Sequence, residues 1–138
     1  MDYCMILGDS TAAGIAAHRK ECVRYVKVGI TSKDWNERYM IQAASAIYDT
    51  VIISLGSNDH GRIKTEDELR KMRHAIQAKQ VFWIGAGMWR RPQAQKAIDM
   101  VASEFGDTII MRSQTSVAGD GVHPSNADYR RMARESTR

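Results

Sequence analysis

Short apolar runs alternate with amphipathic stretches along the whole chain. Runs of this length bounded by polar or turn residues are typical of buried strands. Five are present, at residues 3–7, 23–28, 51–55, 81–84 and 108–111. Between them, apolar residues recur at intervals of three and four, which predicts helices. The helices are expected at residues 12–19, 33–47, from 65 onward, 92–105 and from 125 to about 134.

Several helix ends carry capping signals. Thr65 and Glu68 have the spacing of a capping box. Pro92 stands where a helix can begin, and Gly106 follows the clearest helical stripe of the chain and should end it. In the last helix, Ser125 is the expected cap residue, followed three positions later by an acidic residue.

The β-α alternation predicts an α/β fold with a parallel sheet covered by helices on both faces. Residues 51–55 are almost continuously apolar, as a strand buried on both sides should be. Residues 23–28 include Arg24 and Lys27, which suits a partly exposed edge strand. No linker rich in Pro, Gly or Ser interrupts the pattern, so residues 1–138 are expected to form one domain.

Composition supports a soluble globular protein, with 43% hydrophobic and 26% charged residues. No apolar run approaches the roughly 18 residues that a membrane span needs. The N-terminus shows no basic segment followed by an apolar stretch, so no signal peptide is predicted and the cytoplasm is the expected compartment. Composition does not fix the oligomeric state.

Net charge and cysteine content indicate which ligands the protein could bind and whether its cysteines hold a metal or form a disulfide. The net charge is +4, and the arginines of the second half could attract an anionic substrate or surface, or simply form a solvated face. No basic run has the density or aromatic interleaving of a nucleic-acid site. Cys4 and Cys22 lack the spacing of a metal site and are expected to be buried free thiols, although a disulfide between neighbouring strands stays open.

Polar residues with catalytic potential follow the predicted strands. Ser10 comes after the first strand, Asn58 after the third, and Asp120 precedes His123 by three residues near the C-terminus. Serine hydrolysis needs a hydroxyl, an imidazole base, a carboxylate that orients the base, and donors for the oxyanion. In open parallel sheets, ligands bind at the carboxyl ends of the strands, so these side chains should meet at one edge. Taken singly, each also suits capping or turn formation.

The segments Gly8-Asp9-Ser10, Gly56-Ser57-Asn58-Asp59 and Asp120-Gly121-Val122-His123, together with Gly29, resemble the four sequence blocks of the SGNH (GDSL) hydrolases. That resemblance implies a flavodoxin-like three-layer α/β/α sandwich with strand order 2-1-3-4-5, and ester, thioester or sugar-O-acetyl hydrolysis without a metal or other cofactor. It implies Ser10 as nucleophile, His123 as base and Asp120 as its orienting acid. The oxyanion donors would be the Ser10 and Gly29 N–H groups and the Asn58 side chain. Asp9 resembles the structural aspartate of the motif.

The connections around the expected site are short, which indicates an open, shallow site that removes a small acyl group such as acetyl from a small-molecule or carbohydrate ester. Alternatives are a thioesterase or lysophospholipase of the same fold, or a non-catalytic flavodoxin-like binding module. The candidate substrate contacts follow the second, third and fourth strands, and core packing or a surface role is open for each: Trp35, His60, Arg62, Trp89, Arg90 and Arg91.

Overall fold

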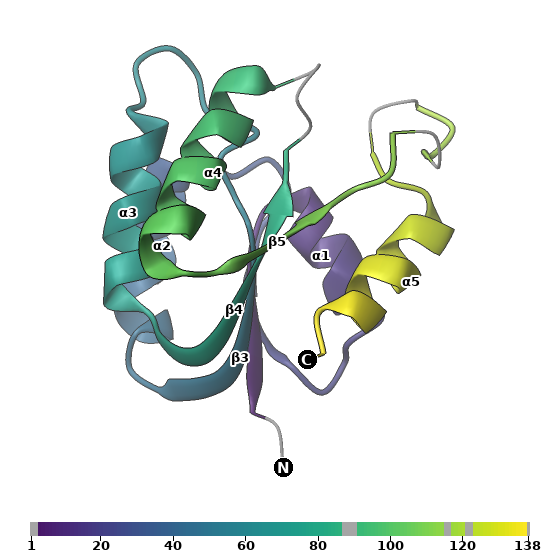
Figure 1. The fold of residues 1–138 in the computed structure, drawn as a ribbon, viewed down its shortest axis with the longest axis horizontal. Coiled ribbons are helices and arrows are strands. Elements are labelled where there is room, and N and C mark those ends of the chain that lie inside the picture. Colours follow the sequence, from purple (N-terminus) through teal and green to yellow (C-terminus); the bar gives the residue numbers. More distant parts are fainter. Residues whose placement is uncertain (1–2, 87–90, 115–116, 121–122, 138) are drawn as a thin grey trace.

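A computed structural model describes residues 3–86, 91–114, 117–120 and 123–137. Its sheet has five parallel strands in the order β2-β1-β3-β4-β5. Helices lie on both sides of this sheet (Figure 1). The strands are β1 (Cys4–Gly8), β2 (Val23–Val26), β3 (Ile47–Ser54), β4 (Gln77–Gly85) and β5 (Thr108–Met111). The predicted α/β class, parallel sheet and strand order are therefore confirmed.

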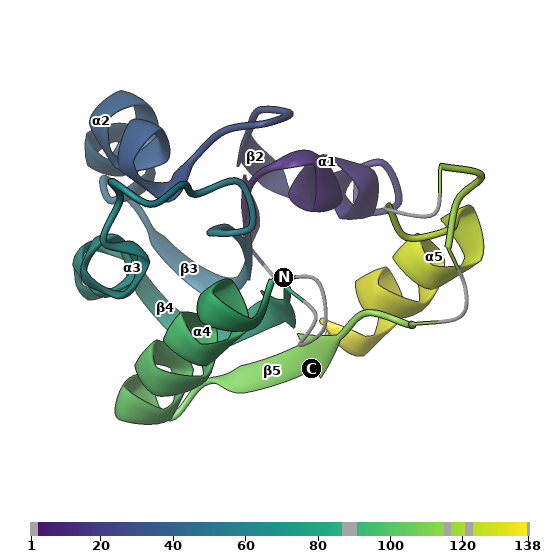
Figure 2. The same ribbon diagram turned by 90° about the horizontal axis from the view of Figure 1, so that it is seen from above.

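Helices cover both faces of the sheet, as the alternation predicts. They are α1 (Ser10–Ala16), α2 (Ser32–Ala43), α3 (Thr65–Ala75), α4 (Pro92–Phe105) and α5 (Asn126–Glu135). Figure 2 shows α2, α3 and α4 on one face and α1 and α5 on the other, and the contacts of α3 with α2 and α4, and of α1 with α5, agree with this grouping. The result is a three-layer sandwich.

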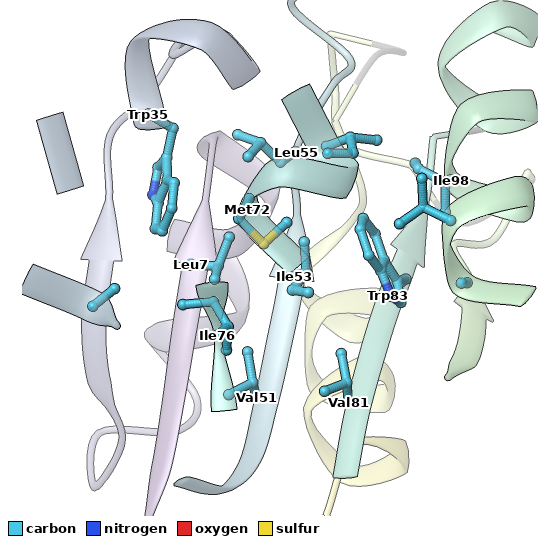
Figure 3. Packing of buried hydrophobic residues seen from close by; sticks show 14 of the residues in the cluster. Leu7, Trp35, Val51, Ile53, Leu55, Met72, Ile76, Val81, Trp83 and Ile98 are labelled. Carbon is cyan, nitrogen blue, oxygen red and sulfur yellow. The ribbon is translucent and has the colours of Figure 1, made fainter. Parts of the chain in front are cut away.

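Alternate residues of each central strand supply two separate cores. Leu7 and Ile53 point toward α2, α3 and α4, where Trp35 and Trp83 fill the layer (Figure 3). Their neighbour Ile52 points to the opposite face, into the cluster formed with α1 and α5. Burial on both sides explains why the central strands read as continuous apolar runs.

The second helix and the third strand differ from their predicted bounds. The helix expected to reach residue 47 ends at Ala43, and β3 begins at Ile47. Tyr48 is buried, and its hydroxyl donates to the Ala43 carbonyl over 2.8 Å, which fixes the turn between the two elements. Ile47 pairs with Gln77, so β4 also begins earlier than the predicted residue 81. Backbone pairing carries both strands beyond their apolar centres.

The capping predictions had different outcomes. Gly106 adopts a left-handed conformation with φ of 70° and ends α4, and the Ser125 hydroxyl accepts from the Asp128 N–H at the start of α5, both as predicted. The capping box at Thr65 is wrong. Lys64 is the cap residue of α3 without a side-chain cap bond, because the Thr65 hydroxyl donates to Asp59 instead.

Two further expectations bear on the whole chain. Cys4 and Cys22 are not free thiols: they form a disulfide between the start of β1 and the residue before β2, with Cα atoms 4.7 Å apart. Parallel pairing of these strands brings the two cysteines together. Within the described ranges, no helix has both the length and the apolar character needed to cross a bilayer.

Candidate active site

The first functional segment turns sharply between β1 and α1. Gly8 has φ of +135°, and a Cβ atom there would lie 1.7 Å from the carbonyl oxygen of Ser54 on neighbouring β3. No side chain fits, so this position requires glycine. The Asp9 N–H donates to the same Ser54 carbonyl over 2.9 Å. The turn leaves Ser10 as the first residue of α1, at the carboxyl end of the sheet.

Asp9 holds this turn together rather than facing solvent. Its Oδ1 atom accepts from the Thr11 N–H over 3.1 Å, which caps α1, and from the Ser54 hydroxyl over 3.0 Å. Burial raises the pKa of the Asp9 carboxyl to about 6, against the opposing effect of these hydrogen bonds. The structural role expected for Asp9 fits this set of contacts.

His123 lies between Ser10 and Asp120. Its Nε2 atom is 3.2 Å from Ser10 Oγ, although the two residues are 113 positions apart in the sequence. Its Nδ1 atom is 2.8 Å from Asp120 Oδ2, and its backbone N–H donates to Asp120 Oδ1 over 3.0 Å. A proton on Nδ1 therefore faces the carboxylate, which leaves Nε2 able to accept the Ser10 hydroxyl proton. The His123 and Asp120 side chains are 44% and 52% exposed, so this end of the site is open.

Asn58 is positioned by the loop that follows β3. Its Nδ2 group donates to the Ile30 carbonyl over 3.2 Å, which ties this loop to the one after β2. The neighbouring Asp59 carboxylate accepts from the Ser32 N–H and hydroxyl and from the Thr65 hydroxyl. These bonds join the starts of α2 and α3, so Asp59 fixes the loop that carries Asn58.

The proposed nucleophile, base and amide line one cavity of about 150 Å³. It is bordered by Asp9, Ser10, Thr11, Ser57, Asn58, Arg91, Arg112 and His123. Gly29 is not among these lining residues. It is exposed, has φ of +79° and borders a separate hollow with Lys27, Asp34 and Arg38. The structure thus brings together all the predicted site residues except Gly29, and of the described candidate substrate contacts only Arg91 borders this cavity.

Comparisons with known proteins agree with this architecture. No family model matches the sequence, and no curated protein matches it. Among solved structures, TesA is 21% identical with a TM-score of 0.69, over 96% of this chain and 94% of that chain. A GDSL-like lipase from Bacteroides thetaiotaomicron is 17% identical with a TM-score of 0.67, over 96% and 84%. Axe2, an acetylxylan esterase from Geobacillus stearothermophilus, is 16% identical with a TM-score of 0.63, over 96% and 91%.

The chain has the fold of the SGNH (GDSL) hydrolases. The similarity covers 96% of this chain. At these identities it concerns the fold alone.

The candidate substrate contacts are placed very differently in this SGNH fold. Trp35 as a sugar platform is wrong: it is completely buried, and its indole N–H donates to the Tyr25 carbonyl over 2.9 Å. His60 borders a hollow of about 400 Å³ next to the site, whereas Arg62 is exposed and borders neither cavity. Trp89 and Arg90 lie outside the described residues.

Arg112 is the site residue that sequence reasoning did not single out. It directly follows β5, so the rule that selected the residues after β1 and β3 also applied to it. Its Nη2 group donates to the Ala86 carbonyl over 2.6 Å. Burial lowers the pKa of the Arg112 guanidinium, an effect that nearby Asp9 opposes.

Metal-binding potential in the described residues is confined to a different region. Cys4, Glu21 and Cys22 are the only group there with three ligand atoms close together. The two sulfur atoms are bonded to each other, so neither is the thiolate that metal binding requires. This cluster lies at the amino end of the sheet, opposite Ser10.

Proposed function

We propose that the protein is a serine esterase that removes a small acyl group, such as acetyl, from a larger alcohol. The observation that carries this proposal is the chain of contacts from Ser10 Oγ to His123 Nε2, at 3.2 Å, and from His123 Nδ1 to Asp120 Oδ2, at 2.8 Å. Serine hydrolysis needs a hydroxyl in contact with an imidazole and a carboxylate in contact with the other nitrogen of that imidazole.

In the proposed reaction, Ser10 Oγ attacks the acyl carbon while its proton passes to His123 Nε2. The C–O bond to the alcohol then breaks, and His123 returns the proton to the leaving alkoxide. A water molecule attacks the acyl-serine and gives its proton to His123, which protonates Ser10 Oγ as the carboxylic acid departs. Asp120 holds the Nδ1 proton of His123 and stabilises the transient imidazolium.

The oxyanion would be held by the Ser10 N–H and the Asn58 side chain. As the first residue of α1, Ser10 has an N–H without an acceptor inside the helix, at the positive end of the helix dipole. Asn58 Nδ2 has two hydrogens, and the Ile30 carbonyl accounts for one of them. Gly29 is left out of this proposal because it borders the other hollow.

Cavity size supports a small acyl group. The cavity beside Ser10 has a volume of about 150 Å³, below the roughly 300–1,000 Å³ of sites that enclose drug-sized ligands. The exposure of His123 and Asp120 leaves the alcohol side open to a larger molecule. A long acyl chain, as a lysophospholipase would bind, has no enclosed groove among the residues that line this cavity.

The proposal is tested by hydrolysis of p-nitrophenyl acetate, butyrate and decanoate by wild type and Ser10→Ala. We expect activity on acetate to exceed that on decanoate, and Ser10→Ala to lower kcat/KM at least 10³-fold without loss of circular-dichroism signal. Wild-type turnover by Ser10→Ala would refute the nucleophile assignment. Equal rates on acetate and decanoate would refute the small-acyl preference.

A further inference from the structure

Cys4, Glu21 and Cys22 bring three metal-binding atoms together at the amino end of the sheet. The two sulfur atoms and one carboxylate oxygen all lie within 4.8 Å of one another. Thiolates and carboxylates are among the ligands that zinc takes in proteins, with bonds of about 2.0–2.3 Å. Tetrahedral bonds of that length place ligand atoms about 3.6–3.8 Å apart, so small side-chain rotations are enough for these three groups to share one ion.

Parallel pairing of β1 and β2 fixes the two cysteines. Cys4 is the first residue of β1, and Cys22 directly precedes β2, whose Val23 pairs with Met5. Their Cα atoms are 4.7 Å apart. Backbone pairing continues from these positions along both strands, so breaking the sulfur–sulfur bond leaves the two cysteines side by side. A reduced chain therefore presents two thiols to one ion.

The Glu21 carboxylate completes the cluster from the solvent side. Cys4 and Cys22 are buried, whereas the Glu21 side chain is 61% exposed. An ion reaching the cluster from solvent therefore meets an exposed carboxylate, and the apolar surroundings of the two sulfur atoms limit the access of water to the Zn–S bonds.

Arg19 supplies the positive charge that such a site needs. Zinc bound by two thiolates and one carboxylate has a net negative charge. Arg19 Nε donates to Glu21 Oε2 over 2.8 Å, and its Nη1 group donates to the carbonyls of Ala133 and Ser136. The guanidinium is thus held beside the cluster, where it compensates the negative charge and orients the carboxylate.

We propose that Cys4, Glu21 and Cys22 bind a zinc ion when the disulfide is reduced, with water as the fourth ligand. A dithiol reductant gives two electrons and two protons to the bridge and is itself oxidised to a disulfide. Zinc then displaces both thiol protons to solvent as the two Zn–S bonds form, and a Glu21 carboxylate oxygen makes the third bond. The ion replaces the disulfide as the link between the starts of β1 and β2, at the end of the sheet opposite Ser10.

The test titrates Zn²⁺ by calorimetry into the whole chain, either oxidised or reduced with a phosphine that is removed beforehand without air. We expect the reduced wild type to bind one equivalent with a Kd of about 1 µM or tighter, and the oxidised protein to bind none at that affinity. Co²⁺ bound in place of zinc should show thiolate-to-metal charge-transfer absorption.

Glu21→Gln should weaken Zn²⁺ binding by about tenfold or more but keep the Co²⁺ absorption, because both thiolates remain. Glu37→Gln is the matched control and should bind as wild type does. The Glu37 side chain is 62% exposed, against 61% for Glu21, and likewise forms a salt bridge, but it lies on α2. Bound zinc should raise the Tm of the reduced wild type by about 5–10 °C.

A reduced wild type that binds no zinc would overturn the inference. Equal affinity in the oxidised and reduced proteins would do the same, because the ion would then bind other residues. Wild-type affinity in Glu21→Gln would exclude the carboxylate as a ligand, and an unchanged Tm with zinc bound would exclude the ion as a link between strands. These measurements do not involve ester hydrolysis, so their outcome is independent of the proposed function.

Discussion

The Asn58 side chain carries two amide hydrogens, and one of them is donated to the Ile30 carbonyl. In the reaction proposed above, the other hydrogen is donated to the developing oxyanion. Removing one oxyanion donor typically costs about 10²–10³ in kcat. We therefore expect Asn58→Ala to lower kcat on p-nitrophenyl acetate by about that factor while KM changes little.

The matched control for Asn58 is Asp59→Asn, which alters the neighbouring side chain that holds the loop. It should change thermal stability more than Asn58→Ala does and affect kcat less. A kcat for Asn58→Ala within twofold of wild type would exclude the side chain as an oxyanion donor. If Asn58→Ala and Asp59→Asn lost the same amount of stability as each other and the same factor in kcat, Asn58 would act only by holding the loop.

Protonation of the Asp9 carboxyl, next to Ser10, makes the free energy of unfolding depend on pH. Its folded pKa is about 6 against an ordinary value of 3.8. A raised carboxyl pKa means that the protonated form is favoured in the folded state, so its stabilising effect is complete below pH 4 and is lost as pH rises through 6. A shift of this size corresponds to at most about 3 kcal/mol.

Asp9→Asn replaces this acid with a neutral acceptor of the same shape. We expect the free energy of unfolding of the variant to exceed that of wild type by about 2–3 kcal/mol at pH 7.5 and to match it near pH 4. Urea unfolding across this range measures the difference, and Asp67→Asn on the exposed side of α3 should retain the wild-type profile. A variant less stable than wild type at pH 7.5 would contradict the raised pKa.

At the scale of helices and strands, hydrophobic periodicity predicted the order of the elements, because the buried face of a helix or strand sets the spacing of its apolar residues. It did not predict the first halves of β3 and β4, where Asp49 and Gln80 interrupt the apolar pattern. These residues belong to strands because backbone pairing, for example Thr50 with Gln80, does not depend on side-chain polarity. The capping box at Thr65 failed for a tertiary reason, since Asp59 competes for the hydroxyl.

Tertiary packing also explains why the prediction of Trp35 in α2 as a substrate contact is wrong. Trp35 follows the glycine block in sequence, which suggested a place beside the site, but α2 turns this residue toward the sheet. Sequence position placed Ser10, Asn58 and His123 at one edge because strand ends define that edge. Position after a strand end did not predict the place of Trp35, because this residue lies inside α2, where helical periodicity decides which side chains meet the core.

Trp35→Phe tests this reassignment of Trp35 to the core. The smaller ring leaves a cavity and removes the hydrogen bond to Tyr25, so we expect a loss of about 2–3 kcal/mol in unfolding free energy. KM for any hydrolysed ester should stay within twofold. Trp83→Phe, in the same buried cluster, is the comparison and should behave alike. A KM that rises with unchanged stability would restore the substrate-stacking interpretation.

At the scale of the whole molecule, the candidate active site and the disulfide lie at opposite ends of the parallel sheet. Ser10, Asn58 and Arg112 follow β1, β3 and β5 at the carboxyl end, and His123 joins them from the segment before α5. The amino end carries the disulfide between Cys4 and Cys22. Since β1 separates the two regions, the disulfide should influence stability without taking part in the site.

Reduction of the disulfide tests this separation. The bridge closes a loop with a sequence separation of 18 residues, which in the chain-entropy account stabilises the folded state by about 3 kcal/mol. We expect reductant to lower Tm by roughly 10 °C while kcat/KM at 25 °C stays within twofold. The Cys4→Ala/Cys22→Ala variant should melt near the reduced wild type and be insensitive to reductant.

Counting the reactive thiols shows whether the disulfide between Cys4 and Cys22 forms in solution. Unfolded under non-reducing conditions, the oxidised chain should show fewer than one free thiol, and both cysteines should react after reduction. Two free thiols before reduction would support the reduced state expected of a cytoplasmic protein. In that case Tm should not respond to reductant, because the protein would hold no bridge between Cys4 and Cys22 for the reductant to break.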